Sequence, residues 1–600
     1  MKKLLLTFTL ALATMCVSAQ SLGDVPATVS ADDVTILKKS VMVIASHDSI
    51  AFNAETGKMD TLRVDDGAKV FSPDEFEQLA KQPKRLRASV VPGEQWGYDD
   101  GDWEALALFS TTLFLYTYKY PSVDADGNVI YLSALMGVPS DMTNLFHAMP
   151  NNLIIGCHET ITSNFECPSE FGTYGFLATG TGNGMMLSYA RNDATRQACN
   201  LVILPDYEGY GITKDRAHPY LYQELTARQV VDAVRSGLAM YQQLVDINEV
   251  DPFEPNWKSV AIGYSQGGSV ALATHKFIEL NGLSDELHFA GSVCGDGPYD
   301  PVAHLRYYMQ DDGETYDGNN RTIHRKEKVS MPIVMPLILK GMCDSNPLMK
   351  QHYVDDYLSA KFLLTESIKF IEAKANDDKD DQYNTTRINK EYVKMMREGK
   401  TGSYTKNYHD SEGSFTLTMH LSADEFQEVL EFYDPGFFYK MQAHGKLQGM
   451  MTSDCYRYFQ NLTADTPVPT EPGMMQDLHR ALESNNLTKG WTPQHRIAFF
   501  HSTYDTVVPY ENLLSFIRNQ QDLTYYFFDN DRSRTTAAGV NCLTASEDKA
   551  NVYIRDATCT DDHVDAGSNF FLWGASGVFG AVGLSPDMRM IRWVLTGSDD

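Results

Sequence analysis

The sequence predicts an α/β fold, in which a mostly parallel β-sheet is covered by helices on both faces and carries a large, mainly helical insertion. Three observations predict this fold. Short, uninterrupted apolar runs recur along the chain, segments of helical periodicity separate them, and one connection between two runs is about 200 residues long. Strands of a parallel sheet appear as continuous apolar runs because helices cover both faces of the sheet.

The apolar runs define the expected strands. A β-rich stretch at 112–120 is followed by turn residues around Gly127 and by a second stretch at 129–138, which together predict a hairpin. Further runs lie at residues 153–156, 201–204, 260–263, 289–293, 497–501 and 524–528. Between them, residues 227–244 have the apolar spacing of an amphipathic helix. The hairpin therefore precedes a series of alternating strands and helices.

The long connection sets the expected domain organisation. A single core stops growing at about 250–300 residues, so a second unit is expected in a chain of 600 residues. We expect the core in two parts, 102–298 and 495–600, with residues 299–494 inserted as a cap over the active site. Helical stretches are expected in this cap at 354–373 and 424–433. Residues 20–101 form a polar segment for which the sequence predicts no role.

The N-terminus has the pattern of a secretory signal. Lys2 and Lys3 precede an apolar run at 4–15 and the small-residue sequence Val17-Ser18-Ala19. Cleavage after Ala19 predicts a signal peptide at 1–19 and a periplasmic or extracellular mature protein. Lipid attachment at Cys16 is the less favoured alternative. No later segment has the length and apolarity that predict a transmembrane helix.

Charge and cysteine content limit the expected partners. The net charge of −29 and the pI near 4.9 disfavour nucleic acid and anionic membranes as partners. In an oxidising compartment, Cys542 with Cys559 and Cys157 with Cys167 are candidate disulfides, and buried free thiols are the alternative. Neither a metal nor a cofactor is predicted, because no paired His or Cys spacing recurs around a candidate carboxylate. The oligomeric state is left open.

The candidate nucleophile is Ser265, in Gly263-Tyr264-Ser265-Gln266-Gly267. An apolar strand precedes this pentapeptide and a helix-compatible segment follows it. This is the strand, sharp turn and helix of a nucleophile elbow, in which the glycines let strand and helix approach closely. The pattern predicts the α/β-hydrolase fold.

A serine nucleophile needs a general base and a carboxylate that orients the base, and on this fold they follow in the order Ser, acid, His. Asp505 fits the acid because it directly follows the apolar run at 497–501. Asp296, after the preceding strand, is the reserve candidate. His563 lies downstream of Asp505 and fits the base; His501 is its competitor.

The oxyanion hole requires two backbone N–H groups near the nucleophile. One is expected from Gln266, the residue after Ser265. The second is expected from the loop Gly156-Cys-His-Glu-Thr160, where Glu159 is the candidate donor and Thr160 lies behind it.

Several of these motifs together resemble the secretory lipase family and related exported α/β-hydrolases. They are Gly-Tyr-Ser265-Gln-Gly-Gly, Pro205-Asp-Tyr-Glu-Gly-Tyr-Gly211, residues 227–235, Asp505-Thr-Val-Val-Pro and His563-Val-Asp-Ala-Gly. The resemblance covers residues 110–300 and 495–580 and implies metal-free ester hydrolysis through an acyl-enzyme on Ser265. His158-Glu159 departs from the His-Gly of many relatives, and residues 300–490 match nothing in the family.

These observations predict an exported serine esterase or lipase that acts on a small-molecule ester. The aromatic and Met content of the cap favours an apolar acyl or aromatic group on that ester. Two alternatives stay open: a serine peptidase of the same fold, and a catalytically silent binding protein for an apolar ligand.

Overall fold

The fold is described from a computed structural model of the chain. It describes residues 22, 24–26, 28–53, 58–82, 85, 88–89, 110–139, 148–161, 164–170, 186–187, 189–190, 199–309, 315–318, 321–324, 328–330, 334–359, 402–410, 413–421, 430–432, 443–503, 505, 507–528, 532–557, 563–572 and 589–598. The predicted signal peptide at 1–19 lies outside these residues.

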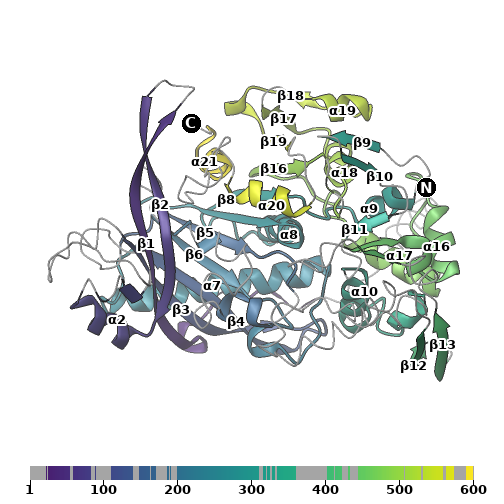
Figure 1. Cartoon of the computed structure of the whole chain (residues 1–600), viewed down its shortest axis with the longest axis horizontal. Helices are drawn as coiled ribbons and strands as arrows, with labels where there is room; N and C mark the ends of the chain where they lie inside the picture. Colours follow the sequence, from purple (N-terminus) through teal and green to yellow (C-terminus); the bar gives the residue numbers. More distant parts are fainter. Residues whose placement is uncertain are drawn as a thin grey trace, which may run out of the picture.

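The centre of the molecule is a 12-stranded sheet (Figure 1). In spatial order its strands are β18 (Leu543–Thr544), β17 (Thr524–Phe527), β19 (Val552–Ala557), β16 (Arg496–Ser502), β8 (Phe289–Gly295), β7 (Ser259–Tyr264), β5 (Asn152–Cys157), β6 (Asn200–Pro205), β4 (Val129–Pro139), β3 (Ser110–Val123), β1 (Thr35–Asn53) and β2 (Lys58–Phe71). Neighbours from β18 to β6 pair in parallel, and those from β6 to β2 pair antiparallel. The prediction of a mostly parallel sheet is confirmed.

The predicted hairpin is the pair β3–β4, in which Tyr120 lies opposite Leu132. Each apolar run predicted as a strand also lies in this sheet. The predicted helix at 227–244 is α7 (Gln223–Asp246), and the helix after the predicted elbow is α8 (Gln266–Leu280). Strand order departs from chain order at β5 and β6, because β6 lies between β4 and β5.

Helices cover both faces of the sheet. On one face, α7, α8 and α18 (Glu511–Asn519) share a core with Leu153 and Ile155 of β5. On the other face, α20 (His563–Leu572) and α21 (Arg589–Thr596) share a core with Ile154 of the same strand. Successive strand side chains point to opposite faces, so one continuous apolar strand supplies both cores.

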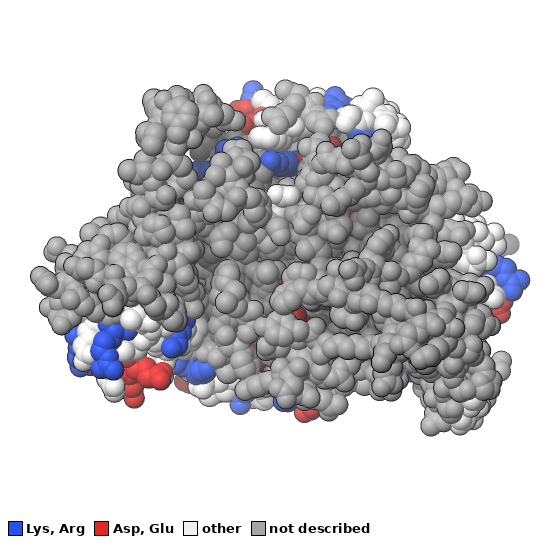
Figure 2. Space-filling view, in the orientation of Figure 1, with Lys and Arg blue, Asp and Glu red and all other residues white. Residues whose placement is uncertain are grey.

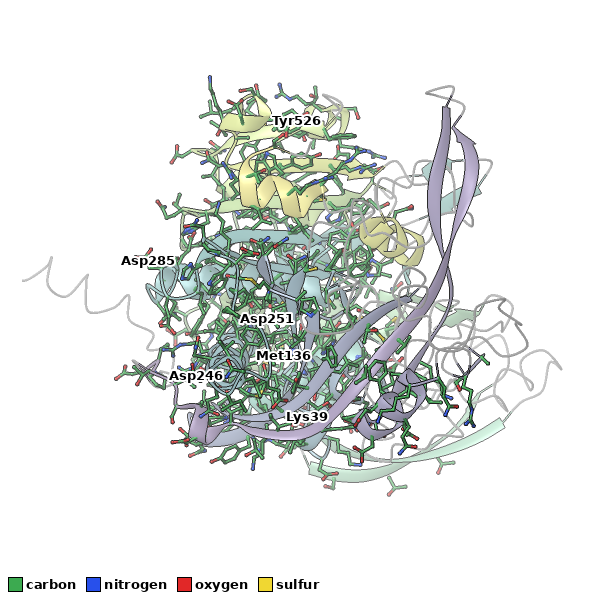
Figure 3. The ribbon with its side chains drawn as sticks, turned by 90° about the vertical axis from the view of Figure 1, so that its left-hand side faces the viewer. Lys39, Met136, Asp246, Asp251, Asp285 and Tyr526 are labelled. Atoms are coloured by element: carbon green, nitrogen blue, oxygen red, sulfur yellow. The ribbon has the colours of Figure 1, made fainter. Side chains whose placement is uncertain are left out.

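The segment at 20–101 contributes the last two strands on one side of the sheet, β1 and the edge strand β2, and the helix α2 (Pro73–Ala80). Figure 1 shows the β1–β2 ribbon at the side of the sheet away from the inserted region. Figure 2 shows side chains of both charges at the corner that α2 occupies, where Lys81 pairs with Glu77. In Figure 3, Met136 of β4 lies in the packed interior, whereas Lys39 of β1 lies toward the periphery.

The described residues between β8 and β16 pack in a further core, which includes Met342, Tyr357 and Phe459 together with Tyr220 and Leu221 from the segment before α7. The inserted segment, 299–494, contains the helices α9 (Pro301–Met309), α10 (Val334–Ser345), α15 (Leu447–Met450), α16 (Ser453–Gln460) and α17 (Met474–Ser484). It also contains the hairpins β9 (Thr315–Gly318) with β10 (Arg321–His324) and β12 (Gly402–Asp410) with β13 (Gly413–Leu421), and a sheet of β11 (Lys328–Ser330), β15 (Ala443–Lys446) and β14 (Leu430–Phe432).

These small sheets mean that the described part of the insertion is mixed rather than mainly helical. The helix predicted at 424–433 is wrong at Leu430–Phe432, where backbone pairing with β15 outweighs local periodicity. Of the helix predicted at 354–373, the structure describes a 3₁₀ turn at Val354–Asp356 and no residue beyond 359.

The predicted disulfide between Cys157 and Cys167 is wrong, because both residues carry free thiols. Both side chains are buried in the core under β5, where the Cys167 sulfur contacts the Ser169 hydroxyl at 3.5 Å. Cys542 is also a free thiol, and Cys559 lies outside the described residues. Within the described ranges, no helix combines the length and apolarity needed to cross a membrane.

Candidate active site

Ser265 occupies a sharp turn between β7 and α8. Its φ of 59° and ψ of −125° are strained for a residue with a side chain. Hydrogen bonds maintain this conformation: the Ser265 N–H donates to the Gly295 carbonyl at 2.9 Å, and the N–H groups of Gly268 and Ser269 donate to the Ser265 carbonyl at 3.0 and 3.3 Å. The hydroxyl is thereby presented at the carboxyl edge of the parallel strands.

The glycines around Ser265 are needed because backbone segments meet there. A Cβ on Gly263 would lie 2.2 Å from the Gly267 carbonyl oxygen, and a Cβ on Gly268 would lie 2.2 Å from that of Gly295. A Cβ on Gly267 would lie 2.0 Å from the Cys157 carbonyl oxygen at the end of β5. The elbow therefore packs directly against the loop that follows β5.

Gly267→Ala is expected to lower the free energy of unfolding by at least about 3 kcal/mol, because the new methyl group meets backbone that cannot turn aside. Chemical denaturation of wild type and variant measures this loss. Gly282→Ala is the matched control, since a Cβ there meets nothing within 4 Å and only its φ of +67° is unfavourable. For the control we expect the free energy of unfolding to fall by about 1–2 kcal/mol. Equal losses in the two variants would contradict the steric argument.

The structure brings the three predicted triad residues together. The Oγ of Ser265 lies 2.7 Å from Nε2 of His563, and Nδ1 of His563 lies 2.5 Å from Oδ2 of Asp505. His563 is the first residue of α20, and Asp505 follows β16. All three residues are buried. Because Asp505 accepts from Nδ1–H, Nε2 is left free to accept the serine proton.

Asp505 is arranged to stay ionised. Burial favours a higher pKa for Asp505, but the charge and hydrogen bond of His563 and backbone N–H groups lower the pKa to below its usual value. Its Oδ1 accepts from the N–H groups of Val507 and Val508, each at 2.7 Å. The second oxygen is thus available to His563, whose positive charge an ionised carboxylate stabilises.

The two reserve candidates lie beside the triad and face each other. Nε2 of His501, the competing base, lies 3.1 Å from the Val508 carbonyl oxygen and 3.4 Å from Oδ1 of Asp296. Asp296 also accepts from the Ser502 N–H at 2.7 Å. Burial, reinforced by the nearby charge of Asp505, raises the pKa of Asp296 well above its usual value. The two carboxyl groups therefore differ: their surroundings lower the pKa of Asp505 and raise the pKa of Asp296.

Asp296→Asn is expected to gain stability relative to wild type as the pH rises above about 4. Because the pKa of Asp296 is higher in the folded protein than in the unfolded chain, the folded state binds more protons, and wild-type stability falls as the pH increases through that window. Asparagine does not titrate and lacks this dependence. Urea denaturation between pH 4 and 8 measures the difference, and parallel curves for the two proteins would contradict a raised pKa of Asp296.

The two predicted oxyanion donors belong to segments that pack on each other. Gln266 is the first residue of α8, where backbone N–H groups have no acceptor within the helix. Glu159 follows β5, and the carbonyls of Cys157 and His158 just before it lie against Gly267. The arrangement is compatible with both N–H groups serving as donors, which stays a prediction.

Sequence reasoning missed two side chains that support this site. The Tyr264 hydroxyl donates to the His563 carbonyl at 2.6 Å, which fixes the start of α20. The Gln266 amide nitrogen lies 2.5 Å from Nε2 of His218, whose Nδ1 is 2.9 Å from the Glu208 carbonyl. A carbonyl only accepts, so Nδ1 of His218 carries the proton and Nε2 accepts from Gln266. The sequence signal for these side chains was their place in the motif, since Tyr264 and Gln266 are the two variable residues of Gly-x-Ser-x-Gly.

His218 is also part of a ring stack that reaches the oxyanion loop. Tyr207 stacks on His158 at 4.0 Å between ring centroids and on His218 at 5.8 Å. His158 is fully buried, and its burial lowers its pKa to about 4. His158, His218 and His275 are all buried, and the side chain of His420 is not among those that the structure describes.

Strand order and elbow geometry define the class of fold. The strands β3, β4, β6, β5, β7, β8, β16 and β19 follow one another across the sheet, the turn at Ser265 joins β7 to α8, and Asp505 and His563 follow β16 and β19. This is the α/β-hydrolase fold, with an insertion between β8 and β16.

Comparisons give distant structural neighbours. Neither a protein-family model nor a curated protein sequence matches the chain. A rice cell wall degrading esterase, LipA, from Xanthomonas oryzae is 17% identical, with a TM-score of 0.47 over 76% of this chain and 88% of that one. A putative hydrolase from Legionella pneumophila is 14% identical, with a TM-score of 0.44 over 76% and 85%. Candida antarctica lipase A in its closed state is 11% identical, with a TM-score of 0.40 over 79% and 78%.

Proposed function

We propose that the chain is an exported serine hydrolase that cleaves carboxylic esters through an acyl-enzyme on Ser265. The observation that carries this proposal is the continuous contact from Ser265 Oγ through both nitrogens of His563 to Asp505, at 2.7 and 2.5 Å. A serine hydroxyl is a weak nucleophile, and this arrangement supplies both the base that accepts its proton and the carboxylate that orients the base.

In the proposed reaction, His563 Nε2 accepts the proton as Ser265 Oγ attacks the ester carbonyl. The N–H groups of Gln266 and Glu159 stabilise the developing oxyanion. His563 then protonates the leaving alcohol, and water releases the acyl group by the same route in reverse. Asp505 stays ionised throughout, since its buried charge stabilises the imidazolium form of His563.

The proposed substrate is a small ester with an apolar acyl or aromatic group, and the proposed location is the periplasm or the extracellular space. The substrate class rests on the apolar composition of the segment between β8 and β16, where Met342, Met349, Met450 and Tyr357 belong to one buried cluster. The location rests on the leader-like residues 1–19. A mature protein that begins at Gln20, identified by N-terminal mass analysis, is the expected product of export.

The test combines active-site labelling with a substrate panel. A fluorophosphonate probe is expected to label Ser265, as mapped by peptide mass spectrometry, and prior labelling should abolish hydrolysis. The panel contains p-nitrophenyl esters of increasing acyl length, aryl esters and aminoacyl amides. We expect kcat/KM for the best ester to exceed that for the best amide by more than about 100-fold, a difference of about 3 kcal/mol.

Each outcome has a distinct meaning. A preference for aminoacyl amides would assign the same triad to a serine peptidase. Absence of labelling in folded protein would contradict the nucleophile and favour a silent binding protein. Ester hydrolysis without labelling of Ser265 would place the reaction elsewhere in the chain.

A further inference from the structure

A cluster of two imidazoles and one carboxylate lies outside the active site. His275 and Glu279 are one turn apart on α8, and His495 comes from the segment just before β16. Ligand atoms from these three residues all lie within 4.8 Å of one another. His275 is fully buried, Glu279 is nearly buried, and the His495 side chain is 31% exposed. One side of the cluster is therefore open to solvent.

Hydrogen bonding in this cluster is unevenly distributed. Four nitrogens surround Oε1 of Glu279: Nε2 of His275 at 2.9 Å, the backbone N of Gln494 at 2.9 Å, and the backbone N and Nδ1 of His495 at 2.8 and 2.7 Å. Oε2 has the Gln494 N at 3.1 Å. A carboxylate has about four lone-pair sites, which is about two on each oxygen. With four nitrogens around it, Oε1 therefore has more neighbours than it can accept hydrogen bonds from.

A divalent cation resolves this crowding. The two backbone N–H groups can continue to donate to Glu279, while the ring nitrogens of His275 and His495 direct their lone pairs at the ion. Two neutral imidazoles and one carboxylate form a common ligand set for zinc, with bonds of about 2.0–2.2 Å and a water in the fourth position. Reaching it requires the rings to withdraw from Glu279 by about half an ångström.

The surroundings of His275 fit a ligating role. Its Nδ1 lies 2.9 Å from the Ser292 hydroxyl on β8, which fixes the ring and directs Nε2 at Glu279. The rings of Phe289 and Trp491 pack edge-to-face with His275 at 4.9 and 5.2 Å between centroids. Metal-ligating histidines usually have such an outer partner on the second nitrogen, and an apolar wall limits access by water.

We propose that His275, Glu279 and His495 form a structural Zn²⁺ site. Glu279 lies near the end of α8 opposite Ser265, about 20 Å along the helix axis, so the ion stays apart from the reaction. The bound ion would connect α8, which begins next to Ser265, to the segment before β16, the strand that leads to Asp505. The site would hold these two segments of the triad in a fixed relation and stabilise the fold by binding the native state.

The test uses the full chain after EDTA dialysis. ZnCl₂ titration by calorimetry is expected to show one saturable site, and one equivalent of Zn²⁺ is expected to raise Tm by more than about 3 °C. Co²⁺ in place of Zn²⁺ should give the ligand-field absorption of a tetrahedral ion, a readout independent of stability and of hydrolysis. Wild-type protein with neither saturable zinc binding nor a Tm shift overturns the proposal.

Variants assign the binding to this cluster. His495→Ala removes the most exposed ligand and is expected to weaken Zn²⁺ binding at least about tenfold and to abolish the Tm shift. His495→Gln serves if the alanine variant does not fold, because its amide can still donate to Glu279. His288→Asn is the matched control: His288 is an exposed histidine outside the cluster, and asparagine tolerates its φ of 48°. Unchanged zinc binding in the His495 variants, or loss in the His288 control, overturns the assignment.

Discussion

Ser265→Ala is expected to lower kcat for a short p-nitrophenyl ester by about 10⁶-fold, with Tm close to that of wild type. The activity is lost because the substitution removes the nucleophilic Oγ that lies beside His563 Nε2. Stability is retained because alanine has the same Cβ as serine and bears the same strain at φ 59°. Steady-state kinetics and a thermal melt on the same preparation measure both effects.

The matched control is Ser284→Ala, which removes a hydroxyl in the turn after α8, away from the triad. It should leave kcat unchanged. Some hydrolysis above the rate in water is expected to survive in Ser265→Ala, because oxyanion donors and substrate binding remain in place. A folded Ser265→Ala protein with more than about a hundredth of wild-type kcat would contradict the nucleophile assignment.

The parts of the fold that follow from local sequence were predictable. Continuous apolar runs such as 153–156 and 260–263 identified buried parallel strands, because a strand covered on both faces has no polar side to show. The elbow at Ser265 was predictable because its glycines have a local steric cause. Candidates for the acid and the base were predictable because, on this fold, each follows a strand and they come after the serine in the order acid, then histidine.

The parts that depend on contacts between distant residues were not predictable. Asp296 and Asp505 both follow strands and both accept from backbone N–H groups, and only the folded contacts show that His563 lies against Asp505. His495 is 216 positions from Glu279, so its cluster has no spacing to recognise. The thiols of Cys157 and Cys167 are near in sequence, but proximity along the chain does not supply the geometry of a disulfide.

Asp505→Asn is expected to lower kcat by about 10⁴-fold at neutral pH while the protein stays folded. The asparagine oxygen can still accept from the N–H groups of Val507 and Val508, which leaves the amide nitrogen facing His563. An N–H at that position favours the tautomer of His563 with its proton on Nε2. That nitrogen then faces Ser265 Oγ as a donor and cannot accept its proton.

Asp296 is not placed to compensate for this loss, since its Oδ1 accepts from Ser502 and lies beside His501. We therefore expect Asp296→Asn to keep kcat within about tenfold of wild type, because the asparagine oxygen can still accept from the Ser502 N–H and burial at this position favours a neutral side chain. Asp522→Asn, in an exposed turn before β17, controls for removal of a carboxylate in general. If Asp296→Asn lost more activity than Asp505→Asn under the same assay, the orienting acid would be Asp296, after β8, instead of Asp505, after β16.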